Sequence, residues 1–194
     1  MKHVPNTLSV VRIVLTPVVL VLLLSQTYRW QVLAVILFAV AAVSDWLDGK
    51  LARTYEARSR LGKFLDPLAD KILVLTTFLA LPVLVPTVVP WWAVALIALR
   101  DVVVTGLRTW TENRGENFPT LQVARMKTLA QLLFLGFMLM LIVAAKAPGE
   151  SGEAARSFLY GPVPYSVLMV VVAFTVYTGV IYVSRFPRIN RPAA

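Results

Sequence analysis

Four aspartates at regular spacing are the residues of this chain best suited to do chemistry. Asp45 and Asp48 stand near the end of one apolar stretch, and Asp66 and Asp70 stand near the start of the next. A carboxylate in or beside hydrocarbon costs about 2.5 to 3.5 kcal/mol, so four of them need a compensating partner such as a metal ion or a charged substrate. We therefore expect this chain to carry out chemistry at a membrane surface.

The spacing within each pair places its two carboxylates on one side of a helix. Residues three or four apart share a helix face, so Asp45 lies beside Asp48, and Asp66 lies beside Asp70. A hairpin of two helices would bring the pairs together, where four carboxylates would repel one another unless divalent cations neutralised them. Such a donor set is typical of a two-metal site, with ions about 3.5 to 4 Å apart, in phosphoryl or nucleotidyl chemistry.

The residue types restrict which metal such a site would hold. The chain has no cysteine and a single histidine, His3, near its amino terminus. Thiolate metal sites and cysteine nucleophiles are therefore excluded, and carboxylate oxygens favour Mg²⁺ or Mn²⁺. Two such ions are the expected cofactor.

Small residues and an arginine lie between the two aspartate pairs. Gly49, Ala52 and Gly62 leave room for a bulky substrate or for close approach of a backbone, and Arg53 is suited to bind a phosphate. Each of these residues alone could instead serve helix packing or a solvated basic loop. Their combination at fixed spacing favours the binding interpretation.

Composition predicts the setting of this site. Hydrophobic residues make up 58% of the 194 residues, which is more than one soluble core requires, so we expect a single integral membrane domain over residues 1–194. The first residues do not fit a cleaved signal peptide, because Arg12 interrupts the apolar run, Pro17 follows and no cleavage site closes it. Apolar stretches approach the length of a membrane span at 8–24, 30–47, 72–85, 91–104, 127–145 and 164–183. The predicted fold class is all-α, with six transmembrane helices and a short amino-terminal segment, 4–12, lying partly in the interface.

The basic residues predict which side of the membrane the aspartates face. Of the 19 lysines and arginines, only Arg29, Lys146 and Arg156 fall on one side of the six predicted helices. By the positive-inside rule, the other side faces the cytoplasm and carries both termini and all four aspartates. We expect a multi-pass protein of the cytoplasmic membrane with a cytoplasmic active site. The aromatic belt of the far interface would then consist of Trp30, Trp91, Trp92, Tyr160 and Tyr165.

The net charge of +9 has a simpler explanation than nucleic-acid binding. The basic residues follow the loops on one side of the membrane, where they would contact anionic lipid headgroups. Membrane lipid is therefore an expected partner, and nucleic acid is not.

The run from Asp45 to Asp70 resembles the signature of the CDP-alcohol phosphatidyltransferases, Asp-x-x-Asp-Gly-x-x-Ala-Arg-x(8)-Gly-x-x-x-Asp-x-x-x-Asp, and matches it at every fixed position. The six predicted helices extend the resemblance over nearly the whole chain. It implies a six-helix membrane enzyme, usually a homodimer, that transfers a phosphatidyl or similar group from a CDP-linked donor to an alcohol and releases CMP. It also implies that Asp45, Asp48, Asp66 and Asp70 bind the metal ions and that Asp70 is the proton acceptor.

The same resemblance assigns residues to the donor, CDP-diacylglycerol. The donor-binding residues it implies within the signature are Gly49, Ala52, Arg53, Ser59 and Gly62. It adds Asn6 and Ser9, which match an Asn-x-x-Thr/Ser element near the amino terminus of the family. These two residues could equally cap the first helix.

Residues outside the signature indicate the acceptor. Four segments resemble phosphatidylglycerophosphate synthases, which implies that glycerol 3-phosphate is the acceptor: Asp66-Pro67-Leu68-Ala69-Asp70-Lys71, Arg100-Asp101, Gly106-Leu107-Arg108 and Met126-Lys127-Thr128. A cationic clamp for the acceptor phosphate would then consist of Arg100, Arg108, Arg125 and Lys127.

These acceptor assignments have alternatives. The four cations could be ordinary loop charges of the positive-inside rule, and Asp101 could simply pair with Arg100 or Arg108. Two positions also depart from the subfamily, because Asp101 stands where glutamate is more frequent and Ala124-Arg125 replaces a Gly-Lys pair. Inositol phosphate or phosphatidylglycerol therefore remain alternative acceptors.

The expected reaction begins with Asp70 removing the proton of the glycerol 3-phosphate hydroxyl. The oxygen then attacks the phosphorus that bears diacylglycerol, and CMP leaves.

A cation transporter and a purely structural membrane protein are the other classes considered, since intramembrane carboxylates often line ion pathways. Neither explains Gly49, Arg53 and Gly62 at their spacing, and the chain shows no internal repeat. The stretch 146–164, with Pro148, Gly149, Ser151 and Gly152, is expected to be a flexible outer loop.

Overall fold

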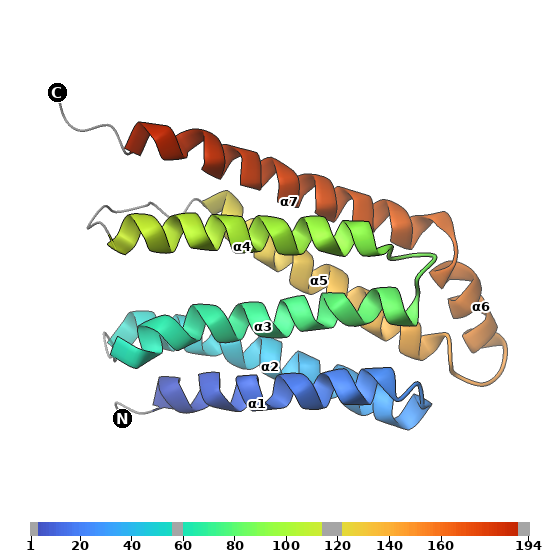
Figure 1. The fold of residues 1–194 in the computed structure, drawn as a ribbon. Coiled ribbons are helices and arrows are strands. Elements are labelled where there is room, and N and C mark those ends of the chain that lie inside the picture. The colour runs from blue at the N-terminus through green and yellow to red at the C-terminus, as the bar shows by residue number, and fades with distance from the viewer. Residues whose placement is uncertain (1–3, 56–59, 114–121, 190–194) are drawn as a thin grey trace.

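The computed structural model describes residues 4–55, 60–113 and 122–189, and all regular structure in these ranges is helical. The helices shown in Figure 1 are α1 (Val4–Leu24), α2 (Tyr28–Tyr55), α3 (Arg60–Leu84), α4 (Trp91–Asn113), α5 (Gln122–Ala144), α6 (Glu150–Leu159) and α7 (Pro162–Ile189). The predicted all-α class is therefore confirmed for the described chain.

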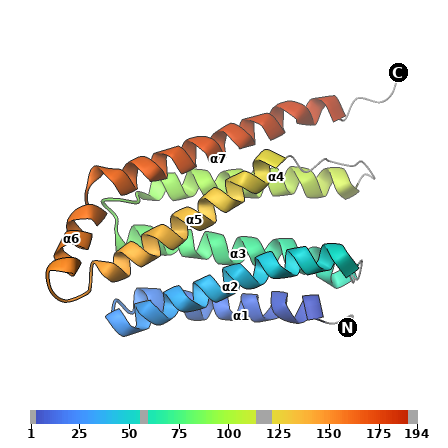
Figure 2. The same cartoon turned by 180° about the vertical axis from the view of Figure 1, so that it is seen from behind.

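Six long helices run side by side, and the short α6 lies across one end of the bundle (Figures 1 and 2). Helix α1 packs against α2 and α3, while α4 and α5 pack against α7. Helix α5 also contacts α2 and α3, so it joins the two groups. The first turn of α1 and the last turn of α7 lie at the end of the bundle opposite α6, together with the last turns of α2 and α4 and the first turns of α3 and α5.

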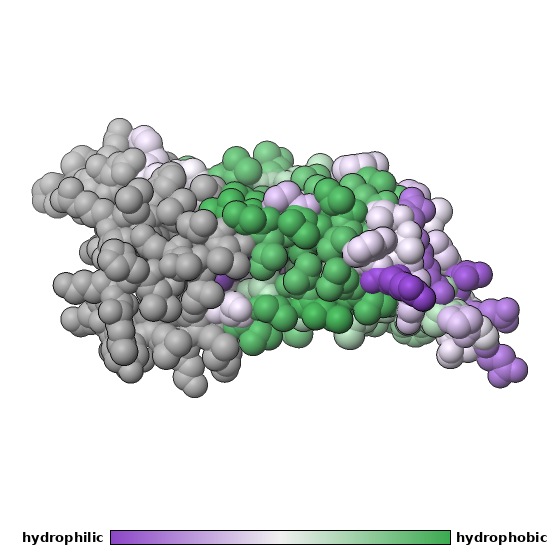
Figure 3. Space-filling model, turned by 90° about the horizontal axis from the view of Figure 1, so that it is seen from below, coloured by the Kyte–Doolittle hydropathy of each residue, from purple (hydrophilic) through white to green (hydrophobic). Residues whose placement is uncertain are grey.

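The interior and much of the exterior are both apolar. Phe78, Leu81, Ile97, Leu135 and Leu139 are fully buried between the helices. The rings of Phe78 and Phe134 stack with centroids 6.0 Å apart. On the face shown in Figure 3, a hydrophobic band crosses the middle of the molecule and polar surface gathers at the end that carries α6. An apolar band around an apolar core is the surface expected of a protein immersed in lipid.

Two helices meet the length and composition of a membrane span among the described residues. These segments are Met126–Ala144 in α5 and Pro162–Ser184 in α7. Shorter apolar segments lie in α1, α2 and α3, whose remaining turns carry polar and charged residues. This pattern is consistent with a membrane protein.

Each of the six apolar stretches predicted from the sequence is helical, and each helix is longer than its apolar stretch. Helix α3 begins at Arg60, well before the apolar residues, and α4 continues to Asn113. Helix α1 runs from Val4 through Pro17 without a break, so residues 4–12 belong to the same helix as the apolar residues that follow. The interfacial position of that segment stays a prediction.

The expectation of a flexible outer loop over 146–164 is wrong for most of that stretch. Gly149 has a φ of 84° and begins α6, whose first turn carries Glu150 and Glu153 and whose last turn carries Arg156. These charges suit the partial charges at the two helix ends. Arg156 Nη2 also donates to the carbonyl oxygen of Ala145 at 3.1 Å, which ties α6 to the end of α5. A ten-residue helix with few apolar residues gives only a weak sequence signal.

Replacing Gly152 with alanine is expected to destabilise this end of the bundle. Gly152 is buried, and a Cβ there would overlap the backbone carbonyl of Ala147, which cannot rotate away. Overpacking of this kind costs about 1 to 3 kcal/mol, so the apparent midpoint of thermal unfolding in detergent should fall. Gly136→Ala is the matched control, because nothing lies within 4 Å of a Cβ at Gly136. Equal midpoints for the two variants would contradict this account of α6.

Candidate functional site

The four aspartates lie on two helices that approach the same end of the bundle. Asp45 and Asp48 are in the carboxyl-terminal half of α2, whereas Asp66 and Asp70 are in the first half of α3. Helical spacing puts the members of each pair on a common helix face. Helix α1 packs against both of these helices, so the backbone brings the two pairs to one region of the molecule.

The proposed donor-binding residues fall on the same three helices or between them. Gly49, Ala52 and Arg53 lie in α2, and Gly62 lies in α3. Ser59 lies outside the described residues, as do the side chains of the aspartates and Arg53. Asn6 and Ser9 are inside α1, which begins at Val4, so their alternative role as its N-cap is wrong.

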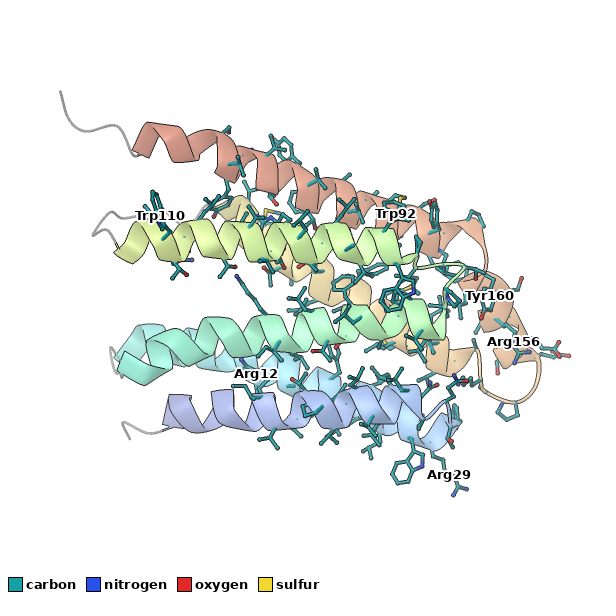
Figure 4. All side chains as sticks on the ribbon, viewed as in Figure 1. Arg12, Arg29, Trp92, Trp110, Arg156 and Tyr160 are labelled. Atoms are coloured by element: carbon teal, nitrogen blue, oxygen red, sulfur yellow. The ribbon has the colours of Figure 1, made fainter. Side chains whose placement is uncertain are left out.

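Arg12 is a buried cation that the sequence analysis did not place in a site. It lies inside α1, is only 4% exposed, and its carbonyl oxygen accepts a hydrogen bond from Thr16 Oγ1 at 2.8 Å. Figure 4 shows its side chain between α1 and α3. A buried guanidinium needs anionic or hydrogen-bonding neighbours, and α1 packs against both helices that carry the aspartates. The feature of the sequence that could have indicated this burial is the charge of Arg12 within a mostly apolar helix.

A second polar cluster is centred on Asp101 of α4. The Asp101 carboxylate accepts hydrogen bonds from Lys127 Nζ of α5 at 2.6 Å and from Arg100 Nη1 at 3.2 Å. The Asp101 and Lys127 side chains are only 6% and 4% exposed. The structure thus supports Asp101 as an ion-pair partner of Arg100, and it identifies Lys127 as a second partner that the sequence analysis did not predict.

Lys71 links this cluster to the helix that carries Asp70. Its Nζ donates to Thr105 Oγ1, and the Thr105 hydroxyl donates to the carbonyl oxygen of Asp101 at 2.6 Å. Lys71 directly follows Asp70 in α3, so its contact with Thr105 ties α4 to the turn of α3 that carries the predicted base. Lys71 belongs to the segment Asp66–Lys71 noted in the sequence, but its pairing with Thr105 could not be read from spacing.

Arg100 also reaches α7. Its Nη2 donates to Thr178 Oγ1 at 3.0 Å, and its guanidinium carbon lies 5.6 Å from the centre of the Tyr182 ring. The remaining two cations of the predicted clamp are placed differently. Arg108 is exposed near the end of α4, and the side chain of Arg125 lies outside the described residues. The structure therefore brings together Arg100 and Lys127 of the four predicted cations.

Among the side chains that the structure describes, Arg100 and Lys127 contact the Asp101 carboxylate, and Lys71 reaches the same region through Thr105. Cations in buried or half-buried positions are suited to bind an anion such as a phosphate. No group of three or more acidic, histidine or cysteine side chains able to hold a metal occurs among the residues whose side chains the structure describes.

Replacing Asp101 with alanine is expected to destabilise the bundle strongly. The change leaves the buried Lys127 ammonium without its carboxylate, and breaking a buried pair costs about 3 to 5 kcal/mol. The apparent thermal midpoint in detergent should therefore drop, and it should recover in the double variant that also carries Lys127→Met. An additive loss in the double variant would show that the two residues do not depend on each other.

Aromatic side chains lie at both ends of the bundle. Figure 4 places Arg29, Arg156 and Tyr160 at the end that carries α6, and Trp110 at the opposite end. The predicted belt residues Trp30, Trp91, Trp92, Tyr160 and Tyr165 are all exposed. Exposed aromatic side chains near helix ends are what an interfacial belt requires.

Comparisons with known proteins identify a family and relatives to which this chain is similar. The family model described as CDP-alcohol phosphatidyltransferase matches residues 2–184. A protein of Bacillus subtilis (strain 168) is 35% identical over 154 residues, which cover 72% of this chain and 78% of that protein. A protein of Pseudomonas fluorescens is 39% identical over 144 residues, covering 71% and 72%. A protein of Escherichia coli (strain K12) is 34% identical over 143 residues, covering 71% and 76%. All three are named CDP-diacylglycerol–glycerol-3-phosphate 3-phosphatidyltransferase.

Proposed function

Because this chain belongs to the CDP-alcohol phosphatidyltransferase family, we propose that it transfers the phosphatidyl group of CDP-diacylglycerol to glycerol 3-phosphate. The products are phosphatidylglycerophosphate and CMP, and the reaction is a step of phospholipid biosynthesis. The three relatives named for this reaction support the proposal.

The cation cluster around Asp101 is the observation that supports glycerol 3-phosphate as the acceptor. A phosphate on the acceptor needs buried or partly buried cations near the base, and Lys71, Arg100 and Lys127 supply them from three helices. Lys71 adjoins Asp70 in α3, so an acceptor phosphate bound at this cluster would hold its hydroxyl near the base. Arg108 and Arg125 extend the same basic surface in this proposal.

Asp70 is the general base of the proposed reaction. It takes the proton of the acceptor hydroxyl while the oxygen forms a bond to the phosphorus that bears diacylglycerol. The bond from this phosphorus to the oxygen shared with CMP breaks, and CMP leaves with that oxygen. The donor nucleotide is held by Asn6, Ser9, Gly49, Ala52, Arg53, Ser59 and Gly62. In-line displacement of this kind depends mainly on positioning and on stabilisation of charge.

Asp45, Asp48, Asp66 and Asp70 would hold two Mg²⁺ or Mn²⁺ ions. The donor set fits these ions, because it consists of carboxylates on two neighbouring helices in a chain without cysteine. When bound, the ions would neutralise charge on the pyrophosphate of the donor.

The membrane arrangement is part of the same proposal. Helices α1 to α5 and α7 would form six spans of a single domain, with both termini and the aspartates in or near the cytoplasm. This orientation lets a lipid-anchored donor and a soluble, anionic acceptor reach one site at the membrane surface. The enzyme would act as a homodimer in the cytoplasmic membrane.

An acceptor comparison tests this function. The purified protein in detergent, with Mg²⁺ and CDP-diacylglycerol, receives glycerol 3-phosphate, inositol phosphate or phosphatidylglycerol in separate reactions. Release of CMP should depend on glycerol 3-phosphate. Release with one of the other acceptors would replace the acceptor in this proposal, and no metal-dependent release with any of them would contradict the proposed transfer altogether.

A further inference from the structure

Helix α7 comes unusually close to the side chain of Arg100. A Cβ at Gly179 would lie 2.8 Å from Arg100 Cγ, a distance that real Cβ atoms almost never adopt. Gly179 is buried, and its φ is not in the left-handed region. The glycine is therefore required by the space that Arg100 occupies and not by the backbone conformation.

The hydroxyl of Thr178 fixes the other end of the same side chain. It accepts a hydrogen bond from Arg100 Nη2 at 3.0 Å and donates one to the carbonyl oxygen of Thr175 at 2.8 Å. The donated bond orients the hydroxyl so that its lone pair faces the guanidinium. Thr178 is 1% exposed, so this arrangement lies inside the bundle.

Arg100 has a hydrogen-bond donor left over in this position. Its Nη1 and Nη2 are engaged by Asp101 and Thr178, whereas its buried Nε has no hydrogen-bond partner in the part of the chain that the structure describes. A buried donor without a partner costs about 1 to 3 kcal/mol, which a bound anion would recover.

We propose that Gly179 and Thr178 of α7 are positioning residues that hold Arg100 in place for the acceptor phosphate. The inference rests on the proposed function. Gly179 lets the Arg100 stem lie against α7, and Thr178 sets the direction of the guanidinium. Helix α7 thereby determines acceptor affinity without itself contacting the reacting atoms.

A purely structural role predicts a different result. If Arg100 only joined α4 to α7, changes at Gly179 or Thr178 would lower stability or affect both substrates alike. A positioning role predicts a selective change in the KM for glycerol 3-phosphate, since the proposed donor-binding residues in helices lie in α1, α2 and α3 and not in α7.

The test uses Gly179→Ala, Thr178→Val and Thr178→Ser in the full chain, with Gly136→Ala as the matched glycine control. The KM values for glycerol 3-phosphate and for CDP-diacylglycerol are measured together with the apparent thermal midpoint. Gly179→Ala and Thr178→Val should raise the KM for glycerol 3-phosphate about tenfold or more, because one hydrogen bond to a charged group is lost or misaligned. The KM for CDP-diacylglycerol should stay within about twofold. Thr178→Ser keeps the hydroxyl and should retain the wild-type KM, as should Gly136→Ala.

The outcomes are separable from those of the proposed function. A wild-type protein that does not use glycerol 3-phosphate would overturn the function itself. A wild-type protein that does use it, with equal changes in both KM values or no change in either, would overturn the positioning role. If Gly179→Ala does not fold, the comparison of Thr178→Val with Thr178→Ser decides the matter on the same criteria.

Discussion

Replacing Asp70 with asparagine is expected to lower the rate of CMP release by about 10² to 10⁴-fold at neutral pH. An amide cannot accept the proton of the acceptor hydroxyl, and general-base catalysis typically contributes a factor of this size. Asparagine has nearly the shape of aspartate, so the fold should persist. The measurement is the rate of CMP release with saturating CDP-diacylglycerol and glycerol 3-phosphate, together with the apparent thermal midpoint.

Glu150→Gln is the control for this substitution. It removes one carboxylate in the same way, but Glu150 is exposed in the first turn of α6, at the end of the bundle away from the aspartates. Its activity should equal that of the wild type. Full turnover by Asp70→Asn at neutral pH would show that another group is the base.

Removal of divalent cations is expected to have a comparably large effect. The four aspartates of α2 and α3 would repel one another without a cation, and the pyrophosphate of the donor would lose its counter-charge. Because a metal ion contributes several kcal/mol of charge stabilisation, excess chelator should lower CMP release by at least about 10³-fold. Addition of Mg²⁺ or Mn²⁺ should restore the activity.

The same chelator already saturated with Mg²⁺ is the control, and it should leave the rate unchanged. The apparent thermal midpoint should also fall in free chelator, since a ligand that binds only the folded state stabilises it. Undiminished CMP release in excess chelator would contradict the assignment of the aspartates as metal ligands.

The helical framework was predictable because apolar runs are a strong local signal. Each run became a helix, and the polar ends of α2, α3 and α4 continued these helices into the region of the aspartates. Helix α6 was not predicted, because it is only ten residues long, half of them are polar and a glycine directly precedes it. A helix of that kind depends on contacts such as Arg156 with Ala145, which join residues from different elements.

The sequence predicted that the two aspartate pairs lie on consecutive helices, and their role as a metal site stays a prediction. The contacts of the polar cluster around Asp101 were predictable only in part. Arg100 and Lys127 were expected near each other as cations of a shared clamp, and Asp101 was an expected partner of Arg100, but the pairing of Asp101 with Lys127 was not predicted. Lys127 lies 26 residues from Asp101 on another helix, and no sequence periodicity relates the two. Lys71 and Thr105 are 34 residues apart, and Arg100 and Thr178 are 78 apart. Because each pair joins two different helices, neither pairing could be predicted from sequence periodicity.

A charged residue inside an apolar helix is itself a sign of a buried polar contact. Arg12 was used only as an interruption of an apolar run, yet the structure buries it between α1 and α3. A charge in such a place is expensive and therefore has a partner. Its position beside the aspartate-bearing helices fits a role near the candidate site.

Identification of the products with labelled acceptor tests the central claim most directly. The purified protein receives Mg²⁺, CDP-diacylglycerol and carbon-13-labelled glycerol 3-phosphate, and the products are identified by mass spectrometry. Attack on the phosphorus that bears diacylglycerol predicts labelled phosphatidylglycerophosphate and unlabelled CMP. Formation of phosphatidate with a labelled phosphodiester of CMP and glycerol 3-phosphate would place the attack on the other phosphorus and contradict the account, as would the absence of any labelled product.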